Sequence, residues 1–479
     1  MEHSQIISPN TVLANSLLNT IDFLRPKIAY LKPKKIVFVV GTQINGVPHL
    51  GTNIVQTVAF LLANEVRHRF SIDTSVKFGA LDNAPKEIIN DPFSFKPYQI
   101  TYFHKIGEEK IHDLIDIYYK SFFDGLSDLT NIEYELETYT KQQEQPEFRQ
   151  EFINSLHKIE DIRWFISPSS GKTHIRIPCP KCSYTEKYSE KTILDELTND
   201  SATFKSYCYE HGDYISTITP NSKDYLDLNT IYRNVIKEAI SKFDGETLYV
   251  MVKGGDWVFG CQLVDWALSG LGYNLNELPI RFFAPQIVVE TGAKLSKSLI
   301  NQNLMSLEGE NANWILDTNQ KLKTDEFYIE NVFKLADTLM SDPKHFFRSY
   351  SYKEIERIME NNKSQSNKMK VRPLRIYRKY YDLIDNGSKT IEVRVGYSSM
   401  RNILAGQLLK FVCQDDECLT IVKRVIHYKS FDELFENEDF KKINPNLDIK
   451  EQLKEIRKIF PKDKEKLGVI AIEVEKVVT

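Results

Sequence analysis

The first part of the chain places apolar runs and helical patterns in the order typical of a parallel sheet. Residues 35–40 (KIVFVV) are short, β-branched and apolar, as expected of a buried strand. A loop containing Gly and Pro follows, and then a helical pattern at residues 54–66 with apolar positions on one face. Another strand is predicted at 75–81. Strand, loop and helix in this order predict an α/β fold with a doubly wound, nucleotide-binding parallel sheet.

The pattern then changes twice before it returns. From residue 101 to about 122 a helical period recurs, which predicts a helical insertion rather than a continuation of the sheet. Residues 173–218 are short segments around cysteines. A helical face at 231–243 and an apolar extended run at 248–252 follow. We therefore predict a sheet that is split by an insertion.

The C-terminal part has a different character. Residues 361–370 (NNKSQSNKMK) are polar and without period, which is typical of a linker. Short strands are predicted near 391–395, 407–412, 419–428 and 469–477, in a small β-rich domain. The predicted divisions are 1–100 for the first half of the core, 101–172 for a helical insertion, 173–218 for a zinc-binding insertion, 219–307 for the second half of the core, 308–360 for a helical connector, 361–370 for the linker and 371–479 for the last domain.

Composition narrows the class of protein. With 479 residues, 42% hydrophobic and 27% charged, the chain is long enough for about three globular domains, which excludes global disorder. The net charge of -4 excludes a uniformly cationic nucleic-acid coat but leaves room for a local basic patch. We find neither a signal-peptide pattern nor an apolar run of membrane-spanning length, so we expect a cytoplasmic protein with no membrane partner. The sequence indicates no oligomeric state.

Two loops carry residues suited to phosphate chemistry. In GVPHLGT, His49 is predicted just before a helix N-terminus, where free N–H groups favour phosphate, and Gly51 permits close approach. In KLSKS at 294–298, Lys294 and Lys297 with interleaved serines can neutralise a departing pyrophosphate. Taken alone, the first is equally an ordinary helix-entry turn and the second a solvated basic loop.

Together the two loops resemble the signature sequences of class I aminoacyl-tRNA synthetases. Residues 49–52 correspond to H-I-G-H, with Thr52 in place of the second His, and residues 294–298 to K-M-S-K-S, with Leu295 in place of Met. Gly254-Gly255-Asp256-Trp257 resembles the family's G-x-D-H turn, with Trp in place of His. The resemblance covers roughly the first 300 residues and implies ATP-dependent formation of an aminoacyl-adenylate, with Mg2+ accompanying ATP.

The resemblance also assigns residues to roles. It implies catalytic roles for His49, Thr52, Lys294 and Lys297, and ATP contacts for Gly51, Asp256, Ser296 and Ser298, with Asp256 near the ribose. An amino-acid pocket is predicted at the ends of the first strands, because ligands of such sheets bind at the carboxyl ends of their strands. The residues predicted to line it are Gly41, Thr42, Gln43 and Asp82.

A cysteine-rich segment predicts a metal site. Cys179 and Cys182 form C-x2-C, and after 25 intervening residues Cys208 and His211 form C-x2-H. Two ligand pairs of equal internal spacing are typical of a tetrahedral structural Zn2+ site, and neither unrelated residues nor a disulfide explains them. The cysteine-rich insertion without a long editing domain most resembles class I lysyl-tRNA synthetases, in which such knuckles brace the face that receives the tRNA acceptor end.

The C-terminal domain carries a further motif. Residues 387–394 (GSKTIEVR) resemble the G-x-K-x-x-E-x-R motif of ASCH domains, small β-barrels related to the PUA fold. Alternation along the strand could bring Lys389, Glu392 and Arg394 to one cleft; a surface strand with cross-strand ion pairs is the alternative. The resemblance implies RNA binding or hydrolysis of modified nucleosides. A basic run at 370–379 is predicted to contact RNA phosphates.

The sequence does not decide which molecule accepts the activated amino acid. Lysyl-tRNA synthetases of class I end in a larger helical domain that reads the anticodon, whereas this chain ends in the small β-rich domain. The sequence is therefore compatible with tRNA and with a different acceptor. A non-catalytic RNA-binding protein with a relic synthetase core is a third alternative. We expect an amino acid and tRNA or another RNA as partners.

Overall fold

The computed structural model describes residues 24–289, 292–296, 314–340, 348–367, 372–397, 400, 403, 407–414 and 416–477. The chain divides into two compact units, residues 1–359 and 360–479, which are described separately. No helix among the described residues is long and apolar enough to cross a bilayer.

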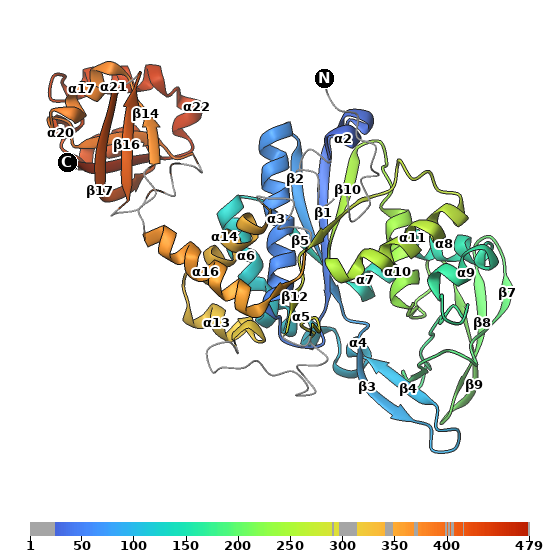
Figure 1. Ribbon diagram of the computed structural model, residues 1–479. Helices are drawn as coiled ribbons and strands as arrows, with labels where there is room; N and C mark the ends of the chain where they lie inside the picture. The colour runs from blue at the N-terminus through green and yellow to red at the C-terminus, as the bar shows by residue number, and fades with distance from the viewer. Residues whose placement is uncertain are drawn as a thin grey trace. The chain divides into compact units, whose positions relative to one another are not determined.

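The first unit is built on a five-stranded sheet whose strands are all parallel (Figure 1). Its strands are β1 (Lys35–Gln43), β2 (Asp73–Leu81), β5 (Tyr134–Thr138), β10 (Thr247–Gly254) and β11 (Ile280–Ala284). They lie in the order β11-β10-β1-β2-β5, so the direction of winding reverses between β1 and β10. This is the strand order of doubly wound sheets, in which ligands bind at the reversal point. The prediction of a parallel α/β sheet is confirmed.

The two faces of this sheet differ in polarity. Phe78, Val252 and Phe282 belong to the largest apolar core, together with helix α3 (Leu50–Phe70), which packs on that face. Because neighbouring residues of a strand point to opposite faces, Lys77 and Lys253 lie on the other side. That side faces helix α10 (Thr230–Ile240), to which the Lys253 side chain is hydrogen-bonded. The sheet therefore has one apolar face and one face that carries buried charge.

The segment 101–138 continues the sheet, contrary to the predicted helical insertion. Helices α4 (Tyr102–Ile106), α5 (Glu108–Ile115) and α6 (Ser121–Thr130), with a π-helical turn at Asp116–Lys120, connect β2 to β5. Strand β5 pairs with β2 in parallel at the edge of the sheet. Its sequence YELET lacks an apolar run because an edge strand is only half covered, and this explains why the pattern did not reveal it.

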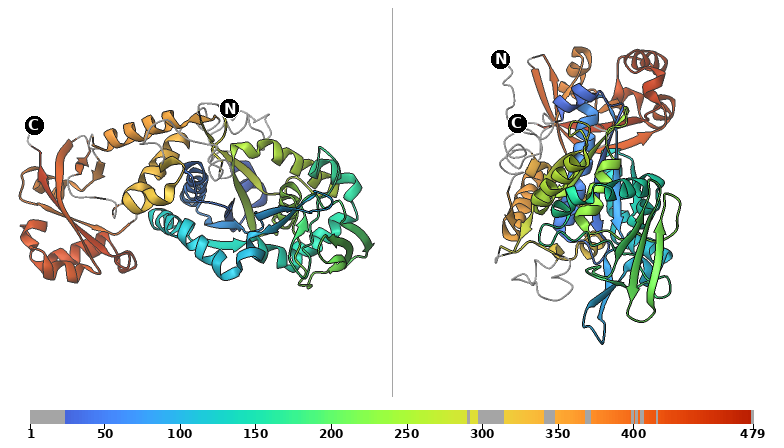
Figure 2. Two further views of the ribbon diagram at one scale, coloured as in Figure 1. Left: turned by 90° about the horizontal axis from the view of Figure 1, so that it is seen from below. Right: turned by 90° about the vertical axis from the view of Figure 1, so that its right-hand side faces the viewer.

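The insertion lies between β5 and β10 and has a core of its own. It contains α7 (Tyr139–Glu144), α8 (Pro146–Leu156) and α9 (Ile159–Ile166), and the three-stranded sheet of β7 (Ile193–Leu197), β8 (Ala202–Cys208) and β9 (Gly212–Ile218). That sheet is drawn in green at the lower right of Figure 2, right. A hairpin of β3 (Pro85–Asn90) and β4 (Pro97–Thr101) forms a separate three-stranded sheet with β6 (Thr185–Glu186).

Several further elements complete the first unit, and the last of them, a helix, continues past the boundary of the unit at residue 359. They are α2 (Arg25–Leu31), the 3-10 turn Gly255–Trp257, α11 (Val258–Leu271), β12 (Ile287–Val288), α13 (Thr318–Thr324), α14 (Tyr328–Met340), β13 (Tyr350–Ser351) and α16 (Tyr352–Asn367). Helix α16 extends through most of the segment predicted as a linker. Lys, Ser, Gln and Asn do not prevent helix formation, so a polar segment without period is compatible with helix continuation.

The second unit contains a five-stranded sheet in the order β14-β16-β17-β18-β15. Its elements are β14 (Arg372–Arg375), α17 (Arg378–Asp385), β15 (Ile391–Val395), β16 (Leu408–Cys413), β17 (Asp416–Tyr428), α19 (Phe431–Asn437), α20 (Phe440–Ile443), α21 (Ile449–Ile459), α22 (Lys462–Glu465) and β18 (Val469–Lys476). The four strands predicted in this domain are confirmed.

The predicted small β-barrel is a curled half-barrel, whose two edge strands are not paired with each other in the part of the chain that the structure describes. Strands β14 and β15 are its two edges, and no backbone pairing joins them within the described residues. Pro373 lies in β14 and has no N–H to donate, which confines that strand to an edge. A side-chain hydrogen bond of 3.0 Å from Arg394 to the carbonyl of Arg375 bridges the two edges instead.

Candidate functional site

A cavity of about 600 Å³ lies at the carboxyl ends of the parallel strands, where the strand order reverses. A volume of this size is typical of small-molecule sites. The structure brings most of the predicted site residues to this cavity. Those among its lining residues are Gly41, Thr42, Gln43, His49, Gly51, Thr52, Asp256, Lys294 and Ser296.

His49 lies at the start of α3, as its position in the loop predicts. It is the N-cap residue of the helix, and its Nδ1 accepts a hydrogen bond of 3.3 Å from the backbone N–H of Thr52. A Cβ atom at Gly51 would lie 3.1 Å from two atoms of the His49 ring, which is tighter than ordinary van der Waals contact. Glycine at position 51 therefore allows the imidazole to lie over the first turn of the helix.

The downstream loop is anchored beside the same cavity. Lys294 forms an ion pair with Asp256, so the basic loop and the acidic turn meet. Leu295 is buried in the main apolar core, and its N–H donates 3.0 Å to Ile287 O. An apolar residue at this position fixes the loop to the core, which explains why Leu serves where the related motif has Met. Lys297 and Ser298 lie outside the described residues.

Asp82 is the predicted pocket residue that the structure places elsewhere. It is 1% exposed and is not among the residues that line the cavity. Its Oδ1 accepts 3.0 Å from the N–H of Thr140, and burial raises its pKa to about 6. The reason is local: Leu81 is the last residue of β2, and the chain turns inward after it.

One wall of the cavity was not predicted. Four residues of α10, spaced three and four apart, line it: Thr230, Arg233, Asn234 and Lys237. Lys77 and Lys253 add two more cations from β2 and β10. The apolar face of α10 was recognised from its sequence, and its opposite face holds these residues. Their helical spacing was the one sequence signal, and a solvated helix face has the same spacing.

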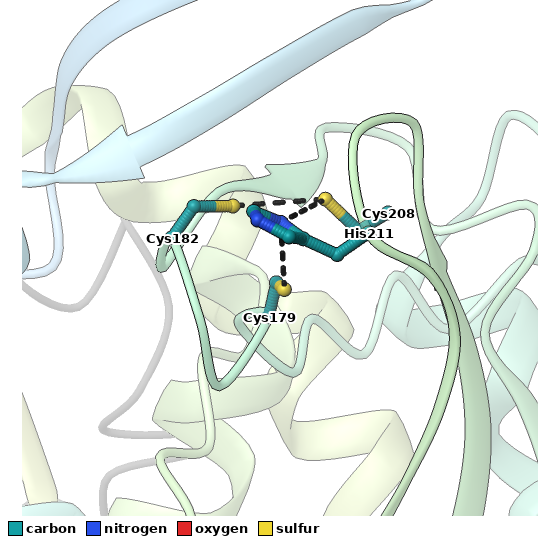
Figure 3. A group of neighbouring side chains, drawn as sticks. All are labelled: Cys179, Cys182, Cys208 and His211. Carbon is teal, nitrogen blue, oxygen red and sulfur yellow. Dashed lines mark hydrogen bonds between the residues drawn. The ribbon is translucent and has the colours of Figure 1, made fainter.

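The four predicted metal ligands converge within the insertion (Figure 3). The ligand atoms of Cys179, Cys182, Cys208 and His211 all lie within 4.8 Å of one another. The sulfur of Cys208 lies 3.6 Å from that of Cys182 and 3.6 Å from His211 Nδ1. A tetrahedral zinc ion with Zn–S distances of about 2.3 Å separates its sulfur ligands by about 3.8 Å. The cluster therefore fits a metal ion such as Zn2+.

Each ligand pair is held by a tight turn. After the first pair, Ser183 has φ 62° and its N–H donates 2.8 Å to Cys179 O. After the second, Gly212 has φ 75° and begins β9. A residue with left-handed backbone directly after the second ligand reverses the chain, so both side chains of a pair point to one spot. Glycine adopts this left-handed conformation readily. Four protein ligands leave no open position, which suits a structural site.

A second cavity, of about 400 Å³, lies in the second unit. Lys389, Glu392 and Arg394 all line it, as predicted. Alternation along β15 accounts for Glu392 and Arg394, whereas Lys389 lies before the strand begins. Glu392 holds the two cations, with 3.3 Å to Lys389 Nζ and 2.8 Å to Arg394 Nε. Lys389 also donates 2.6 Å to Ile391 O and 3.0 Å to Ile443 O, and burial lowers its pKa. The polar group thus forms one end of the cavity.

Comparison with known proteins identifies the second unit. The family model of the ASCH domain matches residues 374–478. Residues 374–478 are an ASCH domain. This confirms the ASCH resemblance of the sequence. The model covers this unit only, so the family of the first unit is not established by it.

Solved structures similar to parts of the chain include three proteins. Hypothetical protein PH0355 is 30% identical, covering 22% of this chain and 100% of its own, with a TM-score of 0.22. Protein PF0455 from Pyrococcus furiosus is 28% identical, covering 23% and 100%, with a TM-score of 0.21. A putative arginyl-tRNA synthetase from Campylobacter jejuni is 11% identical, covering 73% and 72%, with a TM-score of 0.29. TM-scores this low do not define a fold. No curated protein matches the chain.

The ASCH domain has features that its motif did not reveal. The cavity is walled on its other side by apolar residues of α21 and its neighbours, including Ile456, Ile459 and Phe460. Two cations of the predicted RNA-contacting run are paired: Arg378 with Asp416 at 2.7 Å and Lys379 with Glu455 at 2.6 Å. Lys370, at the start of that run, lies outside the described residues. Arg375 lines the cavity, and Arg372 lies in β14.

Proposed function

We propose that the first unit activates an amino acid with ATP and that the chain transfers it to an RNA acceptor. The observation that carries the proposal is the meeting of His49, at the N-terminus of α3, with the Lys294–Asp256 pair at one cavity. That cavity lies where the strand order reverses, the usual ligand position in doubly wound sheets. The two loops are almost 250 residues apart in the sequence, so only the fold brings them together.

In this proposal each polar group has a task that suits its place. The N–H groups at the start of α3 and the His49 imidazole bind phosphate oxygens, and Lys294 and Ser296 bind the pyrophosphate that leaves. Asp256 binds the ribose hydroxyls, after releasing Lys294 to the phosphates. Lys297 and Ser298 belong to the same loop and are proposed to act with Lys294. Mg2+ accompanies ATP and neutralises phosphate charge.

The proposed reaction needs no protein nucleophile. A carboxylate oxygen of the amino acid attacks the α-phosphorus of ATP, the bond to the bridging oxygen breaks, and pyrophosphate leaves. A hydroxyl of the acceptor then attacks the acyl carbon and AMP leaves. The residues accelerate the first step by stabilising charge on phosphorus, an interaction that is strongest in the transition state.

The acceptor side of the proposal involves the other two sites. The metal cluster would brace the insertion, and the ASCH cavity would bind RNA, where cations meet phosphate and Glu392 accepts a hydrogen bond from a base. tRNA is the acceptor that the class I resemblance implies, and lysine is the amino acid it names. A paralog that loads another acceptor would form adenylate and leave tRNA uncharged, so incubation with total tRNA and labelled amino acid separates the two.

Pyrophosphate exchange tests the activation step. We expect the full chain, loaded with zinc, to incorporate labelled pyrophosphate into ATP with one of the standard amino acids. His49→Asn is the informative variant, because Asn keeps an N-cap acceptor for α3 and removes the imidazole. Exchange should fall about 100-fold or more, the usual effect of losing one transition-state contact.

The control for this variant is His112→Asn, at an exposed position of α5. It should exchange at the wild-type rate. Absence of exchange with every amino acid would contradict the proposal, and if nucleotide titration also found no ATP binding, a non-catalytic RNA-binding protein would be favoured.

A further inference from the structure

The cations of α10 lie in a layer different from that of the proposed phosphate-binding groups. His49 and Gly51 belong to α3, which packs on the apolar face of the parallel sheet. Arg233 and Lys237 belong to α10, which lies on the opposite side of the sheet (Figure 1). Both sets line the same cavity. The cavity therefore has a second cationic end, formed by α10, in addition to the loop at Lys294.

Two glycines lie side by side in the part of the cavity wall that β1 and β2 form. Gly41 and Gly79 are register partners on adjacent strands β1 and β2, and both line the cavity. A Cβ atom at Gly41 would lie 3.2 Å from the carbonyl oxygen of Gly79, so even alanine would crowd this spot. Two adjacent glycines leave flat backbone against which a small ligand can lie.

The carboxylates that line the cavity are already engaged. Glu137 pairs with Lys77 at 3.1 Å and accepts a further hydrogen bond of 2.6 Å from Gln145. Asp256 pairs with Lys294. No other acidic residue is among the lining residues of the described cavity. Its negative charges are thus compensated by protein cations.

Two of its positive charges are not compensated in this way. Within the described residues, no carboxylate lies within ion-pair distance of Arg233 or Lys237. Arg233 is 5% exposed, and its Nη1 donates 2.9 Å to the neutral side chain of Asn83. The buried Asp227 near Arg233 is itself paired with Arg176 at 2.6 Å. Lys237 is half-buried. A buried cation such as Arg233 without a carboxylate partner is unfavourable unless a ligand supplies the charge.

We propose that this end of the cavity binds the side chain of an acidic amino acid, aspartate or glutamate, with its carboxylate between Arg233 and Lys237. The inference rests on the proposed function and names the substrate class of the same site. Arg and Lys next to each other provide the donors that a carboxylate accepts. A lysine side chain would bring a third positive group to this end and would be repelled, so the inference departs from lysine, the amino acid that the class I lysyl resemblance names.

The state of Lys237 agrees with this assignment. Burial, with the nearby charge of Lys253, lowers its pKa to about 7. A ligand carboxylate would restore the ordinary pKa, because an opposite charge favours the protonated form. The pocket is therefore arranged so that binding of an anion relieves the repulsion among its own cations.

The test compares amino acids and variants of the full chain. Pyrophosphate exchange is measured with aspartate, glutamate, lysine and neutral amino acids, and binding of the same amino acids is measured by calorimetry in the presence of ATP. For Lys237→Met we expect the KM for the acidic amino acid to rise about 10- to 100-fold, the range for a lost hydrogen bond to a charged group, with the KM for ATP unchanged. Lys237→Arg keeps the charge and should retain most of the affinity. Lys223→Met, at an exposed position, is the matched control.

The outcomes separate this inference from the proposed function. Exchange that depends on lysine or a neutral amino acid would support activation and overturn the inference. No exchange together with acidic-amino-acid binding that Lys237→Met weakens would contradict activation and support the anionic pocket. Neither exchange nor binding of aspartate or glutamate would overturn both. A raised KM for ATP in Lys237→Met would assign the cations to the nucleotide and also overturn the inference.

Discussion

The buried charge beneath the cavity makes a prediction about stability. Glu238 is fully buried, and its carboxylate pairs with Lys253 at 2.9 Å and with Arg281 at 2.5 Å. Arg281 is 2% exposed and pairs further with Asp265 at 2.5 Å. Glu238→Gln keeps the size of the side chain and removes its charge. Among the described residues it leaves Lys253 without a paired carboxylate and Arg281 with Asp265 alone, so the first unit should be strongly destabilised.

Two arguments give a similar magnitude. Burial alone would raise the pKa of Glu238, but the charges of Arg281 and Lys253 outweigh it and lower the pKa to about 2, against an ordinary value of 4.5. At about 1.4 kcal/mol per pKa unit, ionised Glu238 contributes about 3 kcal/mol to folding. Breaking a buried ion pair from one side typically costs about 3–5 kcal/mol. We therefore expect a loss of about 3 kcal/mol or more.

The sign of the pH dependence follows from the lowered pKa. The contribution is fully present above pH 4.5, where Glu238 is ionised in both states, and it is lost as the pH falls toward 2. In Glu238→Gln this part of the acid dependence should be absent. The variant and the wild-type protein should therefore converge in stability at low pH.

Urea unfolding followed by tryptophan fluorescence measures this effect. All four tryptophans, at positions 164, 257, 266 and 314, lie in the first unit, so the signal reports that unit alone. Glu246→Gln, whose exposed carboxylate pairs with Lys34, is the control and should change little. A loss below about 1 kcal/mol for Glu238→Gln, or an unchanged acid dependence, would refute the reasoning.

Two further predictions concern the other sites. Cys208→Ser should lower the zinc content from about one ion per chain and reduce the melting temperature. The control is Cys261→Ser, at a buried cysteine outside the cluster, which should retain zinc. Equal zinc content of the two variants, measured by mass spectrometry, would contradict the site. Arg394→Gln should weaken RNA binding and reduce the slope of log affinity against log salt concentration by about one, and pyrophosphate exchange should be unchanged. Filter binding at a series of salt concentrations measures the slope, and an unaltered slope would exclude a phosphate contact.

The elements that were predicted well share strong local signals. The apolar run of β1 and the apolar positions of α3 are buried, as their sequence patterns predict. The metal ligands were found because their chemistry requires fixed short spacings, which a sequence shows directly. The strand carrying Glu392 and Arg394 was found from simple alternation.

The parts that were missed depend on tertiary contacts. Asp82 follows a strand of the predicted pocket, but the inward turn that buries it is set by its hydrogen bond from Thr140, far along the chain. The polar stripe on α10 looks like an ordinary solvated helix face, because its burial is decided by the sheet opposite. Sequence periodicity shows which face of a helix is apolar, and it does not show what covers the other face.

Strand β5, which the sequence assigned to a helical insertion, determines which charges of the cavity are compensated. Assigning its segment to a helical insertion removes Glu137 from the sheet, and with it the partner of Lys77. Without that pair, Lys77 would count as a further free cation of the cavity, and the compensated and uncompensated charges would not be distinguishable. Once β5 lies beside β2, Lys77 is neutralised within the sheet and the uncompensated charge is confined to Arg233 and Lys237 on α10. The strand order therefore determines where an anionic group of a ligand would bind, and the motifs alone do not.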